Sequence, residues 1–188
     1  EMSKAKTGII GGHTSQSHES SLGFAITGLK NQAHFSNIKA QIEKSESMDW
    51  SLILTKPIGV GLILAAEMRN EAPIESYEDC INSMLISNQQ AAHYLWQNGA
   101  VAMTDVTGFG LAGHLLEMIG TEFSAELYWN HLPFIDGVKH YIEANIIPDA
   151  TYRNWNAYGS EIEWGAGVPV MDAFKLLPDP QTSGGLLI

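Results

Sequence analysis

Two short segments constrain this chain more than any other feature, because each places an aspartate beside hydroxyl residues and glycines. They are Thr104-Asp-Val-Thr-Gly-Phe-Gly110 and Asp179-Pro-Gln-Thr-Ser-Gly-Gly185. Glycine has no Cβ, so the backbone N–H groups of such segments can come close to an anion or to a metal–phosphate complex. A third segment, Gly11-Gly-His-Thr14, has the same character. The three segments predict loops that approach a phosphate-bearing ligand.

The charge of the chain excludes several classes of partner. The 188 residues carry a net charge of −11 with only ten Lys and Arg, whereas a nucleic-acid-binding protein needs a basic surface. The acidity therefore argues against DNA, RNA and anionic membranes as partners. No apolar run approaches the roughly 20 residues of a membrane span, and no signal peptide is recognisable. The one cysteine, Cys80, excludes an intrachain disulfide and fits a cytoplasmic protein.

The pattern of apolar residues predicts an α/β fold in which helices and strands are interleaved. Strands are expected at 24–27, 51–55 and 100–104 and from 186 onward. Helices are expected at 61–69, 76–98, 110–119, 135–143 and 171–177, and an irregular segment is expected at 152–163. We expect one domain over residues 1–188. The apolar run at its end is typical of a strand that continues, so a fragment of a longer protein is expected.

Asp105 is the candidate metal ligand. It follows a predicted strand, where open α/β sheets bind ligands, and its carboxylate is a ligand that Mg²⁺ prefers. On the residues alone, the alternative is that Asp105 caps the following helix. Gly108, Gly110 and Gly113 also match the dinucleotide-binding pattern GxGxxG. A dinucleotide fold is the weaker alternative, because the Asp105 carboxylate would repel a pyrophosphate in the absence of a metal ion.

These segments, taken in order, resemble the C-terminal half of the selenophosphate synthetase family. That family comprises the selenide, water dikinases of the aminoimidazole ribonucleotide synthetase superfamily. The resemblance is carried by 11–14 with Glu19, 23–28, 54–61, 103–110 with Gly113 and His114, 151–154, and 179–185. It covers nearly the whole chain.

The resemblance implies a C-terminal domain in which a mixed β-sheet is covered by helices. It also implies an ATP-dependent homodimer that uses Mg²⁺ to form selenophosphate from selenide and water, releasing AMP and phosphate. Asp105 would join carboxylates of an absent N-terminal half around the magnesium ion, and Gly12, His13 and Thr14 would contact ATP. The reactive Cys or selenocysteine and the catalytic Lys would lie in that absent half. No catalytic residue is therefore expected in this chain, and the chain alone is expected to be inactive.

Two other functions stay open at this point. One is a sibling ATP-dependent enzyme of the same superfamily, and the other is a catalytically silent scaffold or dimerisation domain.

The roles of several polar residues are also open. Lys56 would face a nucleotide or solvent, and Asp179 would belong to a structural turn or to a wall of the active site. Arg153 with Asn154 would orient a phosphate, or Arg153 would form an ion pair. Asn88 is expected to cap a neighbouring loop.

Overall fold

The structure of the chain, a computed structural model, describes residues 7–16, 18–28 and 50–188. The chain divides into two compact units, residues 1–35 and 36–188, and each is described by itself. The described part of the first unit is exposed and carries no helix or strand. The strand predicted at 24–27 is therefore wrong, and the single domain over 1–188 stays a prediction.

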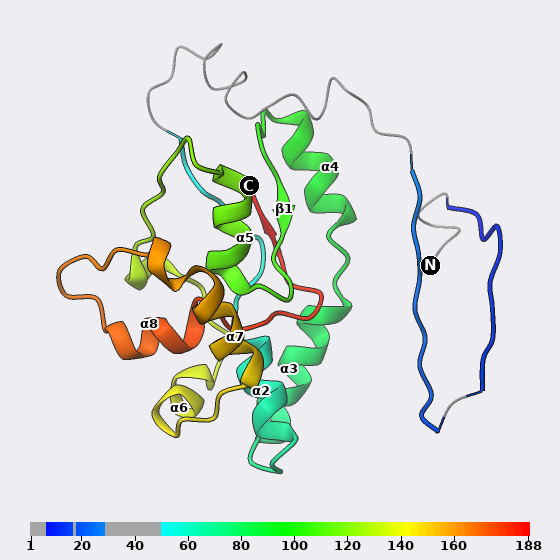
Figure 1. The fold of residues 1–188 in the computed structure, drawn as a ribbon, viewed down its shortest axis with the longest axis horizontal. Coiled ribbons are helices and arrows are strands. Elements are labelled where there is room, and N and C mark those ends of the chain that lie inside the picture. The colour runs from blue at the N-terminus through cyan, green and yellow to red at the C-terminus, as the bar shows by residue number, and fades with distance from the viewer. Residues whose placement is uncertain (1–6, 17, 29–49) are drawn as a thin grey trace. The chain divides into compact units, whose positions relative to one another are not determined.

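The second unit consists of helices packed around a small sheet (Figure 1). Its α-helices are α2 (Val60–Glu67), α3 (Ile74–Leu85), α4 (Gln89–Gln97), α5 (Gly110–Ile119), α6 (Val138–Glu143), α7 (Asp149–Tyr158) and α8 (Val170–Leu176). Its 3₁₀ turns are η2 (Trp129–His131) and η3 (Gly159–Glu161), and its strands are β1 (Thr104–Asp105) and β2 (Leu186–Leu187). The predicted α/β class is confirmed.

β2 is the centre of the narrow sheet. It pairs antiparallel with β1, with Thr104 opposite Leu187. Leu187 also forms an antiparallel bridge to Leu54, so the segment around Leu54 pairs with the opposite edge of β2. A parallel bridge joins Ile58 to Phe134. The paired strands β1 and β2 are thus antiparallel, and the parallel bridge lies outside them.

The hydrophobic core forms around α2, which contacts α3 and α6. Helix α2 reads Val-Gly-Leu-Ile-Leu-Ala-Ala-Glu, apolar around nearly its whole circumference, which is typical of a helix buried on all sides. Leu62 and Ile63 of this helix are fully buried, as are Tyr141 of α6 and Leu176 of α8. No helix in the described residues is long enough and apolar enough to cross a membrane.

The helix predicted at 76–98 is in fact two helices. Between α3 and α4, Ile86 adopts an extended conformation with φ −71° and ψ 120°. Two carbonyls near the end of α3 are bound from distant parts of the chain. The Ser183 hydroxyl donates to Met84 O at 2.7 Å, and the Lys56 amine donates to Ile86 O at 2.7 Å. Because these partners are remote in sequence, helical periodicity alone could not reveal the break.

Two other local predictions are wrong. The segment 100–104 is half-buried, and only its last residue joins β1, because β2 offers only Leu186 and Leu187 for pairing. The segment 152–163, predicted to be irregular, is largely helical in α7 and η3. Asp149 lies in the first turn of α7, where its charge favours the helix N-terminus.

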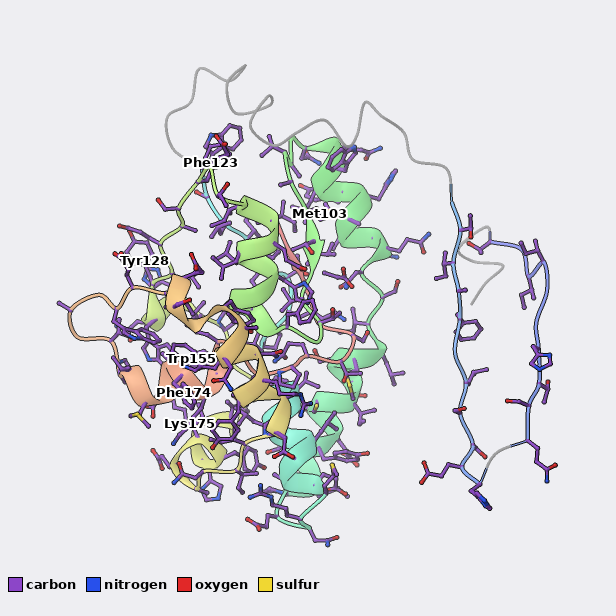
Figure 2. All side chains as sticks on the ribbon, viewed as in Figure 1. Met103, Phe123, Tyr128, Trp155, Phe174 and Lys175 are labelled. Carbon is purple, nitrogen blue, oxygen red and sulfur yellow. The ribbon has the colours of Figure 1, made fainter. Side chains whose placement is uncertain are left out.

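An aromatic cluster holds α7 against α8 (Figure 2). The rings of Trp155 and Phe174 meet edge-on with 5.0 Å between their centroids, and Trp155 stacks on Trp164 at 5.8 Å. Aromatic pairs of this kind are favourable beyond the area that they bury. The buried Lys175 of α8 donates from Nζ to Ile142 O at 2.7 Å, which ties α8 to α6. Helix α7 is therefore fixed against the rest of the unit.

Gly113 allows α5 to approach α7 closely. A Cβ at this position would lie 2.7 Å from Phe109 Cβ and 2.8 Å from Tyr158 Cε1. We therefore expect Gly113→Val to lower the free energy of unfolding by about 1–3 kcal/mol through overpacking, as measured by guanidinium denaturation. Gly165→Val is the matched control, since the nearest atom to a Cβ there is 3.9 Å away. Equal midpoints for the two variants would contradict this prediction.

Candidate functional site

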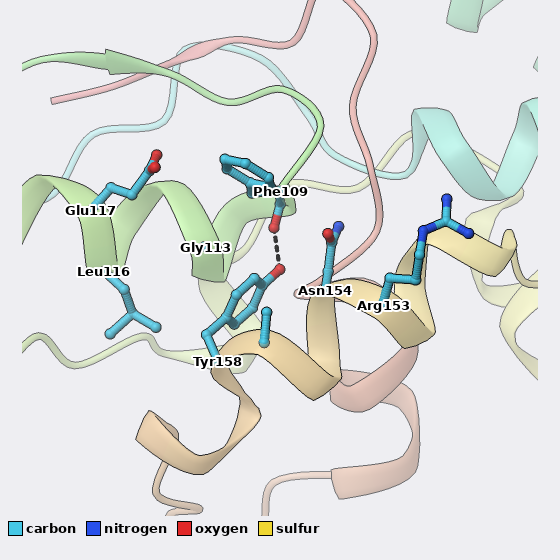
Figure 3. A pocket seen from close by; sticks show the side chains of 8 residues that line it. Phe109, Gly113, Leu116, Glu117, Arg153, Asn154 and Tyr158 are labelled. Carbon is cyan, nitrogen blue, oxygen red and sulfur yellow. Dashed lines mark hydrogen bonds between the residues drawn. The ribbon is translucent and has the colours of Figure 1, made fainter.

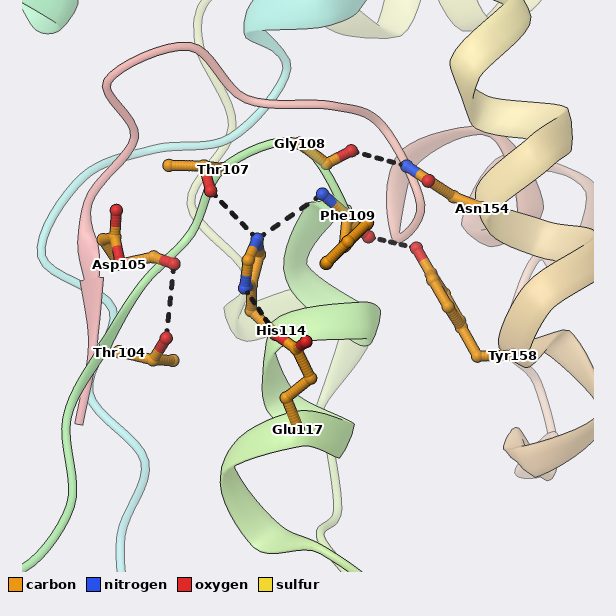
Figure 4. Close-up of polar contacts among 9 residues, drawn as sticks. All are labelled: Thr104, Asp105, Thr107, Gly108, Phe109, His114, Glu117, Asn154 and Tyr158. Atoms are coloured by element: carbon orange, nitrogen blue, oxygen red, sulfur yellow. Dashed lines mark hydrogen bonds and ion pairs between the residues drawn. The ribbon is translucent and has the colours of Figure 1, made fainter. Parts of the chain in front are cut away.

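Asp105 lies at the end of β1 with an exposed side chain, as the sequence predicts. Its backbone pairs with Leu186, and Thr104 Oγ1 donates to its carbonyl oxygen at 3.4 Å (Figure 4). Phe109, not Asp105, is the N-cap residue of α5, and no side chain caps that helix. The helix-capping alternative is therefore wrong, and the Asp105 carboxylate is accessible to a ligand.

One accessible carboxylate fits a share of a magnesium site. Mg²⁺ usually binds one or two protein carboxylates and completes its shell with phosphate oxygens and waters. Among residues 7–16, 18–28 and 50–188, no group of three or more His, Cys, Asp or Glu could hold a metal ion by itself. Asp105 thus suits a magnesium ion whose remaining ligands come from a nucleotide and from residues outside these three ranges.

The loop that follows Asp105 is bound to the His114 side chain (Figure 4). His114 Nε2 lies 3.1 Å from Thr107 Oγ1, and the Phe109 backbone N–H donates to the same nitrogen at 3.4 Å. The other ring nitrogen, Nδ1, lies 3.1 Å from Glu117 Oε2. The sequence motifs predict no role for His114. The available signal was a His and a Glu three residues apart on one helix, a spacing that brings side chains together.

Two side chains of α7 bind the same loop from another direction. Asn154 Nδ2 donates to Gly108 O at 2.8 Å and to Pro178 O at 2.9 Å, so it joins the loop to the segment before Asp179. The Tyr158 hydroxyl donates to Phe109 O. Burial raises the pKa of Tyr158, so this hydroxyl stays protonated and remains a donor. The Asn154 amide thus donates to two backbone carbonyls and has no hydrogen left for a ligand, so the prediction that it orients a phosphate is wrong for this residue.

A pocket of about 490 Å³ lies between α5 and α7, beside this loop (Figure 3). Its lining residues are Phe109, Gly113, Leu116, Glu117, Arg153, Asn154, Ala157 and Tyr158. The volume falls within the range of small-molecule pockets. Arg153 is exposed beside it, so the role of Arg153 in orienting a phosphate stays a prediction.

Asp179 and Gln181 bind the N-terminus of α2. Asp179 Oδ2 accepts hydrogen bonds from Gly61 N at 3.0 Å and from Gln181 Nε2 at 2.8 Å. Gln181 Oε1 accepts from Gly59 N and Val60 N, both at 3.1 Å. The first N–H groups of a helix have no hydrogen-bond acceptor within the helix. At the start of α2, the side chains of Asp179 and Gln181 are the acceptors. Of the two readings of Asp179, the structure supports the structural turn.

Burial governs the ionisation of Asp179. Its side chain is fully buried, and Oδ1 has no hydrogen-bond partner among the described residues. Desolvation raises the pKa of Asp179 to about 8, against the opposing effect of its hydrogen bonds from Gln181 and from the backbone of α2. Burial, followed by the charge of Asp179, raises the pKa of Cys80 to about 11. Cys80 is a buried residue of α3 whose thiol does not readily ionise, so it is not a candidate nucleophile.

Lys56 belongs to a structural connection and does not face solvent. It is only 6% exposed, and its Nζ donates to Ile86 O at 2.7 Å and to Ser183 O at 2.8 Å. Burial lowers its pKa. Asn88 Nδ2 donates to Gly184 O at 2.8 Å, so the prediction that Asn88 caps a neighbouring loop is confirmed. The turn at 183–185 is therefore held to the junction of α3 and α4.

Gly12, His13 and Thr14 lie in the first unit, and all three are exposed. Exposure leaves their backbone N–H groups and the Thr14 hydroxyl available to a ligand. Their contact with ATP stays a prediction, because the first unit is described apart from Asp105.

The chain belongs to the protein family described as "AIR synthase related protein, C-terminal domain". The match covers residues 49–161, which is more than half of the chain. It includes β1, the loop after Asp105, and helices α2 to α7. The aminoimidazole ribonucleotide synthetase superfamily, to which the motifs point, is thus confirmed.

Several relatives carry a more specific name. The chain is 39% identical over 181 residues to the selenide, water dikinase of Pasteurella multocida, which covers 96% of this chain and 49% of that protein. It is 37% identical over 181 residues to the selenide, water dikinase of Burkholderia cenocepacia, with the same coverage. It is 37% identical over 188 residues to that of Aeromonas hydrophila, covering 98% of this chain and 51% of the relative. The chain therefore spans about half the length of these relatives.

Proposed function

We propose that this chain is the C-terminal half of a selenide, water dikinase. The whole enzyme is a cytoplasmic, homodimeric phosphotransferase that converts selenide, ATP and water into selenophosphate, AMP and phosphate. The observation that supports this proposal is the exposed Asp105, which ends a strand and precedes a loop held by His114, Asn154 and Tyr158. The identity to selenide, water dikinases supplies the reaction.

The chain contributes binding and positioning, and the nucleophile comes from the other half. Phosphoryl transfer depends mainly on the placement of the reacting groups and on neutralising the charge of the phosphates. A bound Mg²⁺ would neutralise that charge, and Asp105 is the residue of this chain that would hold it. Gly12, His13 and Thr14 would contact the nucleotide. The rigid attachment of the loop after β1 keeps Asp105 in place when the ion is absent.

Phosphorus-31 NMR of the full-length enzyme with ATP, Mg²⁺ and selenide tests the proposed reaction. We expect AMP, phosphate and one further phosphorus signal, all dependent on selenide. ATP consumption that does not depend on selenide would contradict the proposal and favour a sibling enzyme of the superfamily. Nucleotide that stays intact under these conditions would also contradict it, and would favour a scaffold or dimerisation domain.

The isolated chain is expected to bind Mg-ATP weakly or not at all. Its net charge is −11, and its described residues offer one exposed candidate ligand and no complete metal site. The ATP phosphates would therefore meet repulsion that is appreciable at short range. Calorimetric titration of this chain with Mg-ATP should show no saturation at micromolar concentrations. Saturable micromolar binding would place the nucleotide site within this half and contradict the division of roles.

A further inference from the structure

We infer that His114 and Glu117 are positioning residues that fix the hydroxyl of Thr107 as a hydrogen-bond acceptor beside the metal ligand Asp105. This inference rests on the proposed function, because it concerns the loop that carries Asp105. Its starting point is the chain of contacts from Glu117 Oε2 to His114 Nδ1 at 3.1 Å and from His114 Nε2 to Thr107 Oγ1 at 3.1 Å. Figure 4 shows these three side chains in line.

The direction of the hydrogen bonds follows from the Phe109 backbone. A backbone N–H can only donate, and that of Phe109 points to His114 Nε2 at 3.4 Å. Nε2 is therefore the unprotonated nitrogen of a neutral imidazole, and the proton is on Nδ1, where it is donated to the Glu117 carboxylate. In the contact with the Thr107 hydroxyl at 3.1 Å the hydroxyl is then the donor, and it shares the single lone pair of Nε2 with the Phe109 N–H.

This direction limits what Thr107 can bind. With its hydrogen used by His114, Thr107 Oγ1 retains only lone pairs and acts as an acceptor. It cannot donate to a phosphate oxygen, but it suits a donor such as a water molecule bound to a cation. Mg²⁺ usually keeps several waters when it binds through one or two carboxylates. A neutral acceptor two residues after Asp105 therefore matches a hydrated magnesium ion and not a bare phosphate.

Burial makes the arrangement rigid. His114 is 8% exposed, whereas Glu117 is exposed on the outer face of α5. The imidazole thus has a fixed position in the protein, and Glu117 sets its tautomer from outside. Hydrogen-bonded partners that orient metal-binding groups typically change metal affinity by about 10–100-fold when they are removed.

The test compares His114→Leu with His114→Gln in the full-length enzyme. Leu removes the acceptor for Thr107 and Phe109, whereas the amide oxygen of Gln restores it. We expect His114→Leu to raise the KM for Mg²⁺ by about 10-fold or more, with a smaller change in kcat at saturating Mg²⁺. His114→Gln should stay within about 3-fold of the wild type, as should His93→Leu, a control on the exposed face of α4.

A second measurement does not depend on activity. In the metal-free enzyme, hydrogen–deuterium exchange of the peptide spanning 105–110 should be faster in His114→Leu than in His114→Gln or the wild type. If His114→Leu fails to fold, Glu117→Ala replaces it, because this exposed residue is not needed for the core, and it should raise the same KM by about 3-fold or more. If His114→Leu shows both the KM for Mg²⁺ and the exchange rate of the wild type, the inference is overturned. If the wild type shows no selenide-dependent turnover, only the proposed function is contradicted. The exchange measurement would still test whether His114 positions the loop that carries Thr107.

Discussion

Asp105→Asn is expected to lower kcat/KM for Mg-ATP in the full-length enzyme by more than about 100-fold. Removing a residue that only orients a metal ligand typically costs less, about 10–100-fold in affinity or activity. Asn has nearly the same shape as Asp but no charge, so it is a much weaker ligand for Mg²⁺. Asp105 is exposed and its carboxylate caps no helix, so the fold should be retained. Steady-state ATP turnover at several Mg²⁺ concentrations measures the effect.

The matched control for this variant is Asp136→Asn, which removes the same charge from another exposed aspartate. It should turn over ATP at the wild-type rate, which separates loss of the ligand from a change in net charge. Thermal unfolding should give similar midpoints for both variants. Wild-type turnover by Asp105→Asn at ordinary Mg²⁺ concentration would rule out a role for this residue in metal binding.

Asp179→Asn is expected to remove a large pH dependence of stability. Burial raises the pKa of Asp179 from 3.8 to about 8. Between these values the folded protein keeps a proton on the carboxyl that the unfolded chain has released. The free energy of unfolding therefore falls as the pH rises from about 4 to about 8, and this contribution is constant outside that window. Asn stays neutral throughout, so the variant lacks this contribution.

Between pH 5 and pH 7, the wild type should lose about 3 kcal/mol of unfolding free energy relative to Asp179→Asn, since one pKa unit corresponds to about 1.4 kcal/mol. Denaturant unfolding curves measured across this range provide the comparison, and Asp136→Asn should follow the wild type. The comparison between variants cancels the titration of the other carboxylates. A constant difference between the wild type and Asp179→Asn over the whole range would show that Asp179 ionises with an ordinary pKa in the folded protein.

The parts of the fold that were predictable are those with strong local signals. Helix α5 begins at Gly110 and ends at Ile119, as the sequence predicts, because its apolar residues follow a helical period between two glycines. Leu111 and Leu115 lie four residues apart on one face of this helix and are buried, and Met118 on the same face is partly buried. The exposed position of Asp105 at the end of a strand was predictable because it directly follows an apolar segment and precedes glycines.

The parts that were not predictable depend on partners far away in the sequence. Lys56 looks like a surface residue in isolation, and its burial depends on carbonyls at positions 86 and 183. Asp179 looks like a ligand in a glycine-rich turn, but Gly61 leaves the space in which its carboxylate reaches α2. Helix α7 is polar overall, and its stability comes from the contacts of Trp155 with aromatic residues outside the helix. Such contacts leave no periodic signal in the helix itself.

The claim that Asp105 binds the metal ion of the nucleotide is tested most directly by titration with Mn²⁺, followed by electron paramagnetic resonance. Mn²⁺ binds the same kind of oxygen ligands as Mg²⁺. In the full-length enzyme with ATP, Asp105→Asn should raise the Kd for Mn²⁺ by at least about 10-fold over both the wild type and Asp136→Asn. The same Kd for all three proteins would contradict the assignment of Asp105 as a metal ligand.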